Sequence, residues 1–339
     1  MLRLFKDAHY DFIGIRRWAY GFSALFIIPG LLWLLVAGLN YSIEFTGGTF
    51  IHIRTTTPIG TGAIRAALTN GGVTGAEVNT FGSETEYSVK ARVSAERAGT
   101  EAGTEETVSA VQRALDAGLG NGTYTIVRRE AVGPKVGREL QGKALIAILF
   151  SFVVTLMYLA VRFEWRFGLA AIAATAHDIL ATIIFIRYLN LEVSLVVVAA
   201  VLTIVGYSLN DTIVIFDRVR ENLRKYRRQN LYEILNLSIN ETLPRTVLTG
   251  GTTILTALTL AFIAGEVIRP FSLVMTFGII VGTFSSIFVA SPVLLWIERR
   301  WPGEDARGVR TIGTRAPASQ VAPATPTPSP SPRTPLPAR

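Results

Sequence analysis

The amino-acid sequence predicts a polytopic α-helical membrane protein with six transmembrane helices and a small α+β domain inserted after the first of them. Half of the 339 residues are hydrophobic and only 17% are charged, and the mean hydropathy is +0.39. Six stretches stay mostly apolar over about 20 residues, the length that a helix needs to cross the hydrocarbon core of a bilayer. The net charge of +8 reflects basic residues beside membrane helices, so we expect no nucleic-acid partner.

The first predicted span, 18–39, follows a cytoplasmic N-terminal segment at 1–17. Its length, Pro29 and the lack of a small-x-small cleavage site indicate an uncleaved anchor and not a signal peptide. The other five spans fall within 139–300. They are 143–161, 166–187, 193–216, 246–265 and 271–297. Lys and Arg gather in alternate short loops, which predicts that both termini are cytoplasmic.

The segment 40–138 between the first two spans is therefore expected on the periplasmic or extracytoplasmic side. Apolar alternation and turn signals predict the order strand, helix, strand, strand, helix, strand, with the first helix stopping at Asn70-Gly71-Gly72. This is the order of a split βαβ, ferredoxin-like sandwich. A plain packed module fits the pattern as well as a binding role does. The expected elements are strand 49–54, helix 61–69, strand 76–81, strand 86–93, helix 104–118 and strand 123–132.

Two further segments are expected on the cytoplasmic side. Apolar residues recur at helical spacing within the basic loop 217–245, which predicts an amphipathic helix that lies on the membrane or docks onto a partner protein. These residues are Leu231, Ile234, Leu235, Ile239 and Leu243. Residues 301–339 are rich in Pro, Ser, Thr and Ala, which predicts a disordered tail because such a composition cannot bury a core.

The composition also restricts the chemistry. The chain has no cysteine, which excludes disulfides, thiolate metal sites and cysteine nucleophiles. Its three histidines, His9, His52 and His177, are scattered along the sequence, which argues against a zinc site. No nucleophile motif or phosphate-binding loop is apparent. We therefore expect neither a metal nor a cofactor, and not an enzyme.

Only two carboxylates fall inside the six predicted spans, Asp178 in the third and Asp211 in the fourth. Ionisable groups at membrane depth are rare because burial without a partner is costly, and they mark ion paths, relays or clamps between helices. Asp178 follows His177 in the sequence. For this pair, a structural role and a supporting role in a proton path both remain open.

Asp211 differs from Asp178 in its polar neighbours. Asn210 precedes it, and polar residues continue along the helix to Asp217 and Arg218 at the cytoplasmic edge. A cytoplasmic loop joins the fourth and fifth spans, so Arg245 at the start of the fifth lies at a similar membrane level and is the expected partner of Asp211. The fifth span also supplies hydroxyl groups, from Thr249, Thr252 and Thr253.

An Asp–Arg pair of this kind can handle protons. Desolvation and a nearby guanidinium act on a buried carboxylate in opposite directions, so making and breaking the pair couples proton binding to helix movement. The arginine keeps its proton and acts electrostatically. A static salt bridge that pins two helices is the alternative.

Six motifs occur in order along the chain. They are DFIGIRRW before the first span, IEFTGGT at 43–49, VGPKVGREL at 132–140, TAHD at 175–178, GYSLNDTIVIFDRVREN at 206–222 and NETLPRTVLTGGTT at 240–253. Over about residues 9–300 the sequence therefore resembles the SecF family of protein-export membrane subunits, in the RND superfamily. Glu44 stands where the family most often has Asp.

The resemblance implies an RND half-transporter architecture and late-stage help to preprotein export, driven by the proton-motive force across the bacterial cytoplasmic (inner) membrane. The implied partners are SecD in a heteromeric complex, the SecYEG channel, YajC, YidC and the unfolded preprotein. Asp211 and Arg245 match the family's proton-path positions. Two glycine-containing stretches resemble joints between the outward domain and the membrane. Their residues are Glu44, Phe45, Thr46, Gly47, Gly48, Gly133, Pro134 and Gly137.

Two other functions remain open at this stage. One is a proton-coupled small-molecule or lipid exporter of the same superfamily, against which the small outward insert argues. The other is a scaffold that stabilises the translocase without transporting anything. Neutral substitution of Asp211 would lower complex assembly in a scaffold, but would remove proton dependence in a proton-driven subunit.

Overall fold

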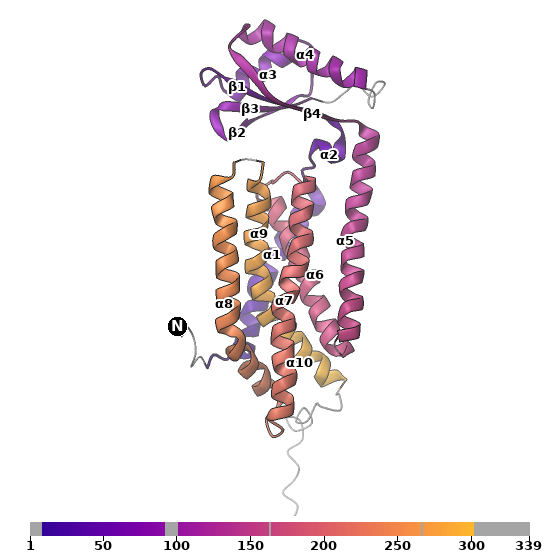
Figure 1. Ribbon diagram of the computed structural model, residues 1–339, viewed down its shortest axis with the longest axis vertical. Coiled ribbons are helices and arrows are strands. Elements are labelled where there is room, and N and C mark those ends of the chain that lie inside the picture. The colour runs from indigo at the N-terminus through magenta and orange to yellow at the C-terminus, as the bar shows by residue number, and fades with distance from the viewer. Residues whose placement is uncertain (1–8, 92–100, 163, 266, 302–339) are drawn as a thin grey trace, which may run out of the picture.

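The computed structural model describes residues 9–91, 101–162, 164–265 and 267–301. Within these residues a bundle of long helices stands below a small sheet domain (Figure 1). Most of the predicted tail at 301–339 and the first eight residues of the predicted N-terminal segment lie outside the described residues.

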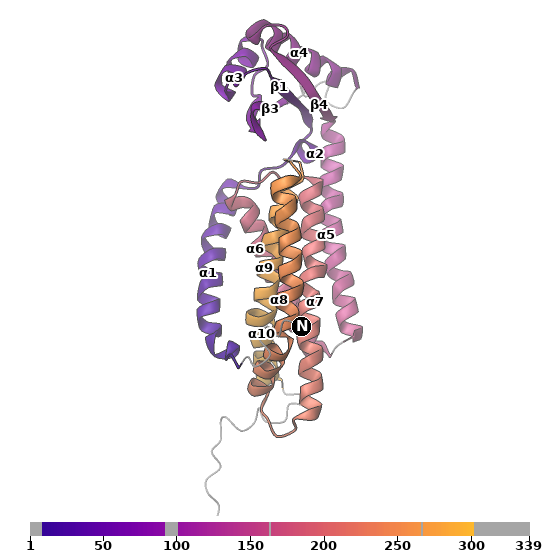
Figure 2. The ribbon, with the colours of Figure 1, turned by 60° about the vertical axis from the view of Figure 1, so that its left-hand side comes forward.

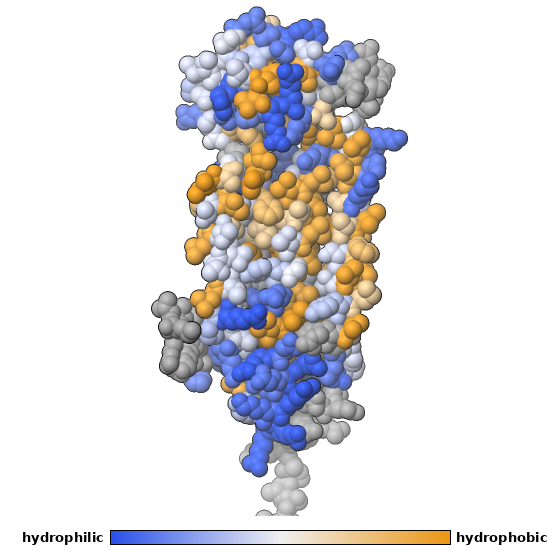
Figure 3. All heavy atoms as spheres, viewed as in Figure 1, coloured by the Kyte–Doolittle hydropathy of each residue, from blue (hydrophilic) through white to orange (hydrophobic). Residues whose placement is uncertain are grey.

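Six helical segments of the described chain are long and apolar enough to cross a membrane, which confirms the predicted fold class. They are α1 (Phe12–Ala37), α5 (Pro134–Arg162), α6 (Trp165–Tyr188), α7 (Leu195–Lys225), α8 (Leu231–Ile263) and a final segment of α9 (Arg269–Ser285), a π-helical turn (Ser286–Ala290) and α10 (Ser291–Arg300). Apolar residues cover the middle of the bundle and hydrophilic residues both ends (Figure 3). The chain is a multi-pass membrane protein.

The structure corrects the prediction of a surface helix in the cytoplasmic loop. Helix α8 begins at a capping box formed by Asn230 and Glu233 and runs without a break through Pro244 into the membrane segment. The first apolar residues of α8 pack inside the protein and not against lipid or another protein. Leu235, for example, is fully buried in a core that includes Phe216 of α7 and Leu294 of α10. The apolar pattern was read correctly, but the chain's own helices cover it.

The small sheet domain, for which an outward location was expected, has the predicted order of elements. It consists of β1 (Gly48–Thr55), α3 (Thr61–Asn70), β2 (Glu77–Phe81), β3 (Ser83–Ala91), α4 (Glu101–Leu119) and β4 (Tyr124–Val132). The strands pair antiparallel in the order β2-β3-β1-β4, the split βαβ arrangement. Apolar residues of the sheet and of both helices form one core, including Ile51, Val89, Leu68 and Leu115. The small sheet domain of the predicted fold class is therefore present.

Two chain connections join this domain to the bundle. Helix α1 leads through the short helix α2 (Ile43–Thr46) into β1, and β4 leads directly into α5. Figure 2 shows α1 and α5 on opposite sides of the bundle, both reaching up towards α2. Helices α7 and α9 pack closely between them, since Gly278 of α9 contacts Ile204 and Gly282 contacts Ser208.

Candidate functional site

Asp211 lies in the interior of the bundle. Only 4% of its surface is exposed. The hydroxyl Oγ1 of Thr283, on α9, donates a hydrogen bond to Asp211 Oδ2 over 3.4 Å. The carboxylate therefore faces α9. Glycines on α9 let the two helices approach closely enough for this bond.

Arg245 does not contact Asp211 in this structure. Within the described residues no ion pair joins the two side chains, and Arg245 is exposed on α8. It is nevertheless close enough to interact electrostatically with the carboxylate. Sequence position places both residues at a similar membrane level, but in this structure the side-chain hydrogen bond of Asp211 is to Thr283 of α9 and not to Arg245 of α8.

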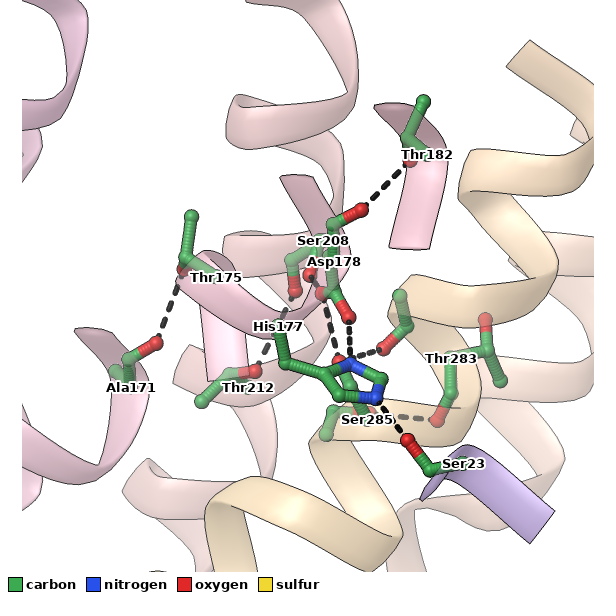
Figure 4. A network of polar contacts seen from close by, with 12 residues as sticks. Ser23, Ala171, Thr175, His177, Asp178, Thr182, Ser208, Thr212, Thr283 and Ser285 are labelled. Carbon is green, nitrogen blue, oxygen red and sulfur yellow. Dashed lines mark hydrogen bonds and ion pairs between the residues drawn. The ribbon is translucent and has the colours of Figure 1, made fainter. Parts of the chain in front are cut away.

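Asp178 is the centre of a more extensive polar network (Figure 4). It is 1% exposed, and its Oδ2 accepts hydrogen bonds from Ser208 of α7 and from Ser285 of α9, the latter at 2.7 Å. Its Oδ1 lies 3.0 Å from Nδ1 of His177. The other ring nitrogen of His177, Nε2, lies 2.6 Å from the hydroxyl of Ser23 on α1. Asp178 and His177 of α6 together thus connect four helices, α1, α6, α7 and α9.

This network stands beside Asp211. Ser208 precedes Asp211 by less than one helical turn on α7, and Ser285 follows Thr283 by two positions on α9. Sequence reasoning missed Ser23, Thr283 and Ser285. In the sequence, each of these residues is recognisable only as a hydroxyl group within an apolar helix. Such hydroxyl groups commonly bond to the backbone of their own helix, so they do not by themselves indicate a site.

The other predicted polar residues take different positions. Asn210 is exposed on α7. The hydroxyls of Thr249, Thr252 and Thr253 donate to carbonyl groups of their own helix, and Thr253 also accepts a bond from Tyr207 of α7. Asn210, Arg245 and Thr252 are exposed, whereas Thr249 and Thr253 are half-buried. Figure 3 shows paler residues interrupting the apolar belt over α7 and α8.

Asp217 and Arg218 lie farther along α7, towards the basic end of the bundle. Arg218 donates to Glu221 over 2.7 Å and to Glu241 of α8 over 2.6 Å, so it ties the ends of α7 and α8 together. Asp217 lies 4.0 Å from Arg220. The structure does not bring either residue into contact with Asp211.

The predicted joint residues converge where α2 meets α5. Gly47 and Gly48 have φ angles of 75° and 141°, a backbone region that favours glycine. A side chain on Gly137 would lie 2.8 Å from the carbonyl oxygen of Phe45, so this glycine permits close contact between α5 and α2. Gly133 accepts a hydrogen bond from the Gly137 amide, and Pro134 opens α5. The Thr46 hydroxyl donates to the Ser42 carbonyl.

No group of three or more His, Asp or Glu side chains among the described residues is arranged to hold a metal ion. The site's chemistry is therefore that of two buried carboxylates, one imidazole, hydroxyl groups and one nearby guanidinium. Such a set can bind, hold and exchange protons.

Comparison with known proteins gives consistent results. Residues 113–300 match the family model "Protein export membrane protein SecD/SecF, C-terminal", and residues 32–58 match "SecD/SecF GG Motif". The chain is 52% identical to protein translocase subunit SecF of Gemmatimonas aurantiaca, over 91% of this chain and 95% of that one. It is 39% identical to the SecF subunit of Rickettsia felis, over 86% and 92%.

Solved structures agree. A crystal structure of SecDF, described as a translocon-associated membrane protein, from Thermus thermophilus superposes with a TM-score of 0.76 at 37% identity. A SecDF structure in a super-membrane-facing form gives a TM-score of 0.63 at 38% identity. In both comparisons the match covers 87% of this chain but only 39% of the SecDF chain.

Proposed function

The chain belongs to the SecF family of protein translocase subunits, and we propose from this premise that it uses protons to promote late-stage preprotein export. Asp211 is the proton-binding group, and Arg245 and Asn210 complete the proton path. The observation that carries the proposal is a carboxylate buried at membrane depth, with no cation in contact among the described residues and a guanidinium within electrostatic reach.

This geometry suits a two-state cycle. A protonated Asp211 is neutral and can remain in the interior beside Thr283. An ionised Asp211 is drawn towards Arg245, and α7 and α8 must shift for the pair to form. Proton binding and release then alternate two arrangements of these helices.

Asp178 and His177 have a supporting role in this cycle. A carboxyl group at 1% exposure is costly without polar partners, and His177 is one of them, with its Nδ1 3.0 Å from Asp178 Oδ1. The hydrogen bonds to Ser208 and Ser285 fix α7 and α9 next to Asp211. Asp178 is thus a positioning residue for Asp211.

The exposed polar residues of α7 and α8 support a membrane partner. Exposing Asn210 and Arg245 to lipid costs free energy. The helices of SecD would cover both side chains. We further propose association with SecYEG, YajC and YidC, action on an unfolded preprotein, location in the bacterial cytoplasmic (inner) membrane, and cytoplasmic termini. The outward domain spans about 40–138, and the membrane part about 139–300 after the first span.

The test compares Asp211→Asn and Arg245→Met with Glu221→Gln, which removes an exposed carboxylate from the same helix. We expect both site variants to reach normal abundance and to co-purify with SecD, while the proton-dependent part of export is lost. Glu221→Gln should export normally. Undiminished export by Asp211→Asn would refute the proton path, and loss of SecD binding would favour the scaffold.

A further inference from the structure

The outer end of α7 is bonded to the base of the outward domain. The amide of Val193 donates to the carbonyl of Asn40 over 2.7 Å, and the amide of Ser42 donates to the carbonyl of Val193 over 2.9 Å. Tyr41 and Val193 form an isolated parallel β-bridge. These bonds join the segment before α2 to the segment before α7, which are far apart in the sequence.

Glu44 adds a contact to the first residue of α7. Its Oε2 accepts a hydrogen bond from the amide of Leu195 over 2.5 Å. The N-cap Ser194 accepts from the amide of Val197, so Glu44 satisfies a second free amide of the same helix end. A carboxylate there also interacts favourably with the helix dipole.

Phe45 fixes the same point by packing. It is 4% exposed and lies in a core with Val197 and Val201, from the first two turns of α7. Behind it, Gly137 of α5 contacts its backbone closely. We call Tyr41, Glu44, Phe45 and Val193 the α7 clamp.

The chain can change direction immediately beyond the clamp. Gly47 and Gly48, of which Gly48 is the first residue of β1, follow the clamp closely, and both have positive φ. Among the described residues, an ion pair spans this pivot between Lys90 Nζ of β3 and Glu192 Oε2 at 2.5 Å. The predicted joint therefore has two parts: an anchored half, Glu44 and Phe45, and a glycine pivot.

We propose that the α7 clamp is a fixed connection that passes movement of α7 around Asp211 to the outward domain, which then tilts about Gly47 and Gly48. The inference rests on the proposed function, because it requires that protons at Asp211 move α7. The backbone connects the outward domain to α1 and α5 but not to α7. The clamp supplies the missing connection, and Glu44 is its positioning residue.

The test breaks the clamp and then replaces it covalently. Coupling between two sites is typically about 5–150-fold, so we expect Glu44→Ala to reduce the proton-dependent export rate at least about fivefold at normal abundance and SecD binding. The matched control is Glu139→Ala, which removes an exposed carboxylate of α5 paired only with Lys143 among the described contacts. It should export normally.

The chain has no cysteine, so Tyr41→Cys with Val193→Cys introduces one unambiguous pair. Neighbouring bridge positions lie about 4.8 Å apart, within the range that a disulfide spans. In the Glu44→Ala background, oxidation should restore the proton-dependent export rate, and reduction should lower it again to the rate of the Glu44→Ala variant. This comparison uses the same membranes, so it does not depend on the variant's abundance.

Three results would overturn the inference. Normal export by Glu44→Ala would show that the clamp transmits nothing. Failure of the disulfide to restore export would show that Glu44 acts otherwise. Loss of export on oxidising the cysteine pair with Glu44 intact would show that the clamp must open. Measuring Asp211→Asn in parallel separates the two proposals: if it loses proton dependence and Glu44→Ala does not, only the clamp is wrong.

Discussion

Replacing Gly282 by alanine tests the close contact of α7 and α9 beside the proposed proton site. The added Cβ would lie 2.8 Å from Cβ of Ser208 and 3.1 Å from its Cα. Carbon atoms in contact prefer about 3.5–4.0 Å, so α7 must retreat by roughly 0.7 Å at this level. The same shift lengthens the hydrogen bond from Ser208 to Asp178.

The expected cost can be estimated from these contacts. Overpacking of this kind costs about 1–3 kcal/mol, and alanine returns about 1 kcal/mol through its higher helix propensity. Weakening a hydrogen bond to a charged group adds up to about 1.5–3 kcal/mol. Together these contributions give a net loss of roughly 0–5 kcal/mol, with a middle value of about 2 kcal/mol, or several degrees in melting temperature.

The assay measures thermal unfolding in detergent and proton-dependent export for Gly282→Ala and for Gly21→Ala. A side chain on Gly21, in α1, would meet no atom within 4 Å. We expect the Gly282 variant alone to melt lower and to export less. Equal behaviour of the two variants would refute both the close helix contact and its role in holding the site.

Three further predictions follow from particular contacts. Asp178→Ala should be less stable than Asp178→Asn by about 1–3 kcal/mol, because the hydroxyls of Ser208 and Ser285 lose their acceptor and His177 loses its partner; equal melting temperatures would contradict the network. Leu235→Ala should cost about 2–5 kcal/mol, since this side chain is fully buried; an unchanged melting temperature would instead support a helix lying on the membrane surface. The hydrogen bond from Arg54 holds the pKa of Glu86 below its ordinary value. Its ionised form therefore stabilises the outward domain above the ordinary pKa of glutamate, and this contribution is lost as the pH falls through the lowered pKa. Glu86→Gln should cost about 0.2–1 kcal/mol at neutral pH and nothing in strong acid, and a pH-independent difference in chemical unfolding would contradict this assignment.

The sequence predicted what depends on local pattern. Long apolar stretches gave the six spans, because only a helix satisfies its own backbone within a bilayer. The order of strands and helices predicted the small sheet domain. The helix ends differ from the predicted spans: α7 continues beyond residue 216 to Lys225, and α8 begins at Leu231, before the predicted start at 246, since a helix does not stop where its residues become charged.

Contacts that depend on helix rotation could not be predicted. The spacing of Leu231, Ile234 and Leu235 is the same whether the partner is lipid, another protein or the chain itself. The sequence places Asp211 and Arg245 at a similar membrane level. Whether the two side chains point towards each other depends on how α7 and α8 are rotated about their axes. The acceptor role of Asp178 towards Ser285 likewise requires the position of α9, which no local pattern encodes.

The central claim is that protonation of Asp211 drives export, and translocation in membrane vesicles tests it most directly. Vesicles containing SecYEG, SecD and either the wild-type chain or Asp211→Asn would translocate a preprotein with and without an imposed proton gradient. We predict that the gradient accelerates translocation with the wild-type chain and has no effect with Asp211→Asn. An equal acceleration in both preparations would contradict the account.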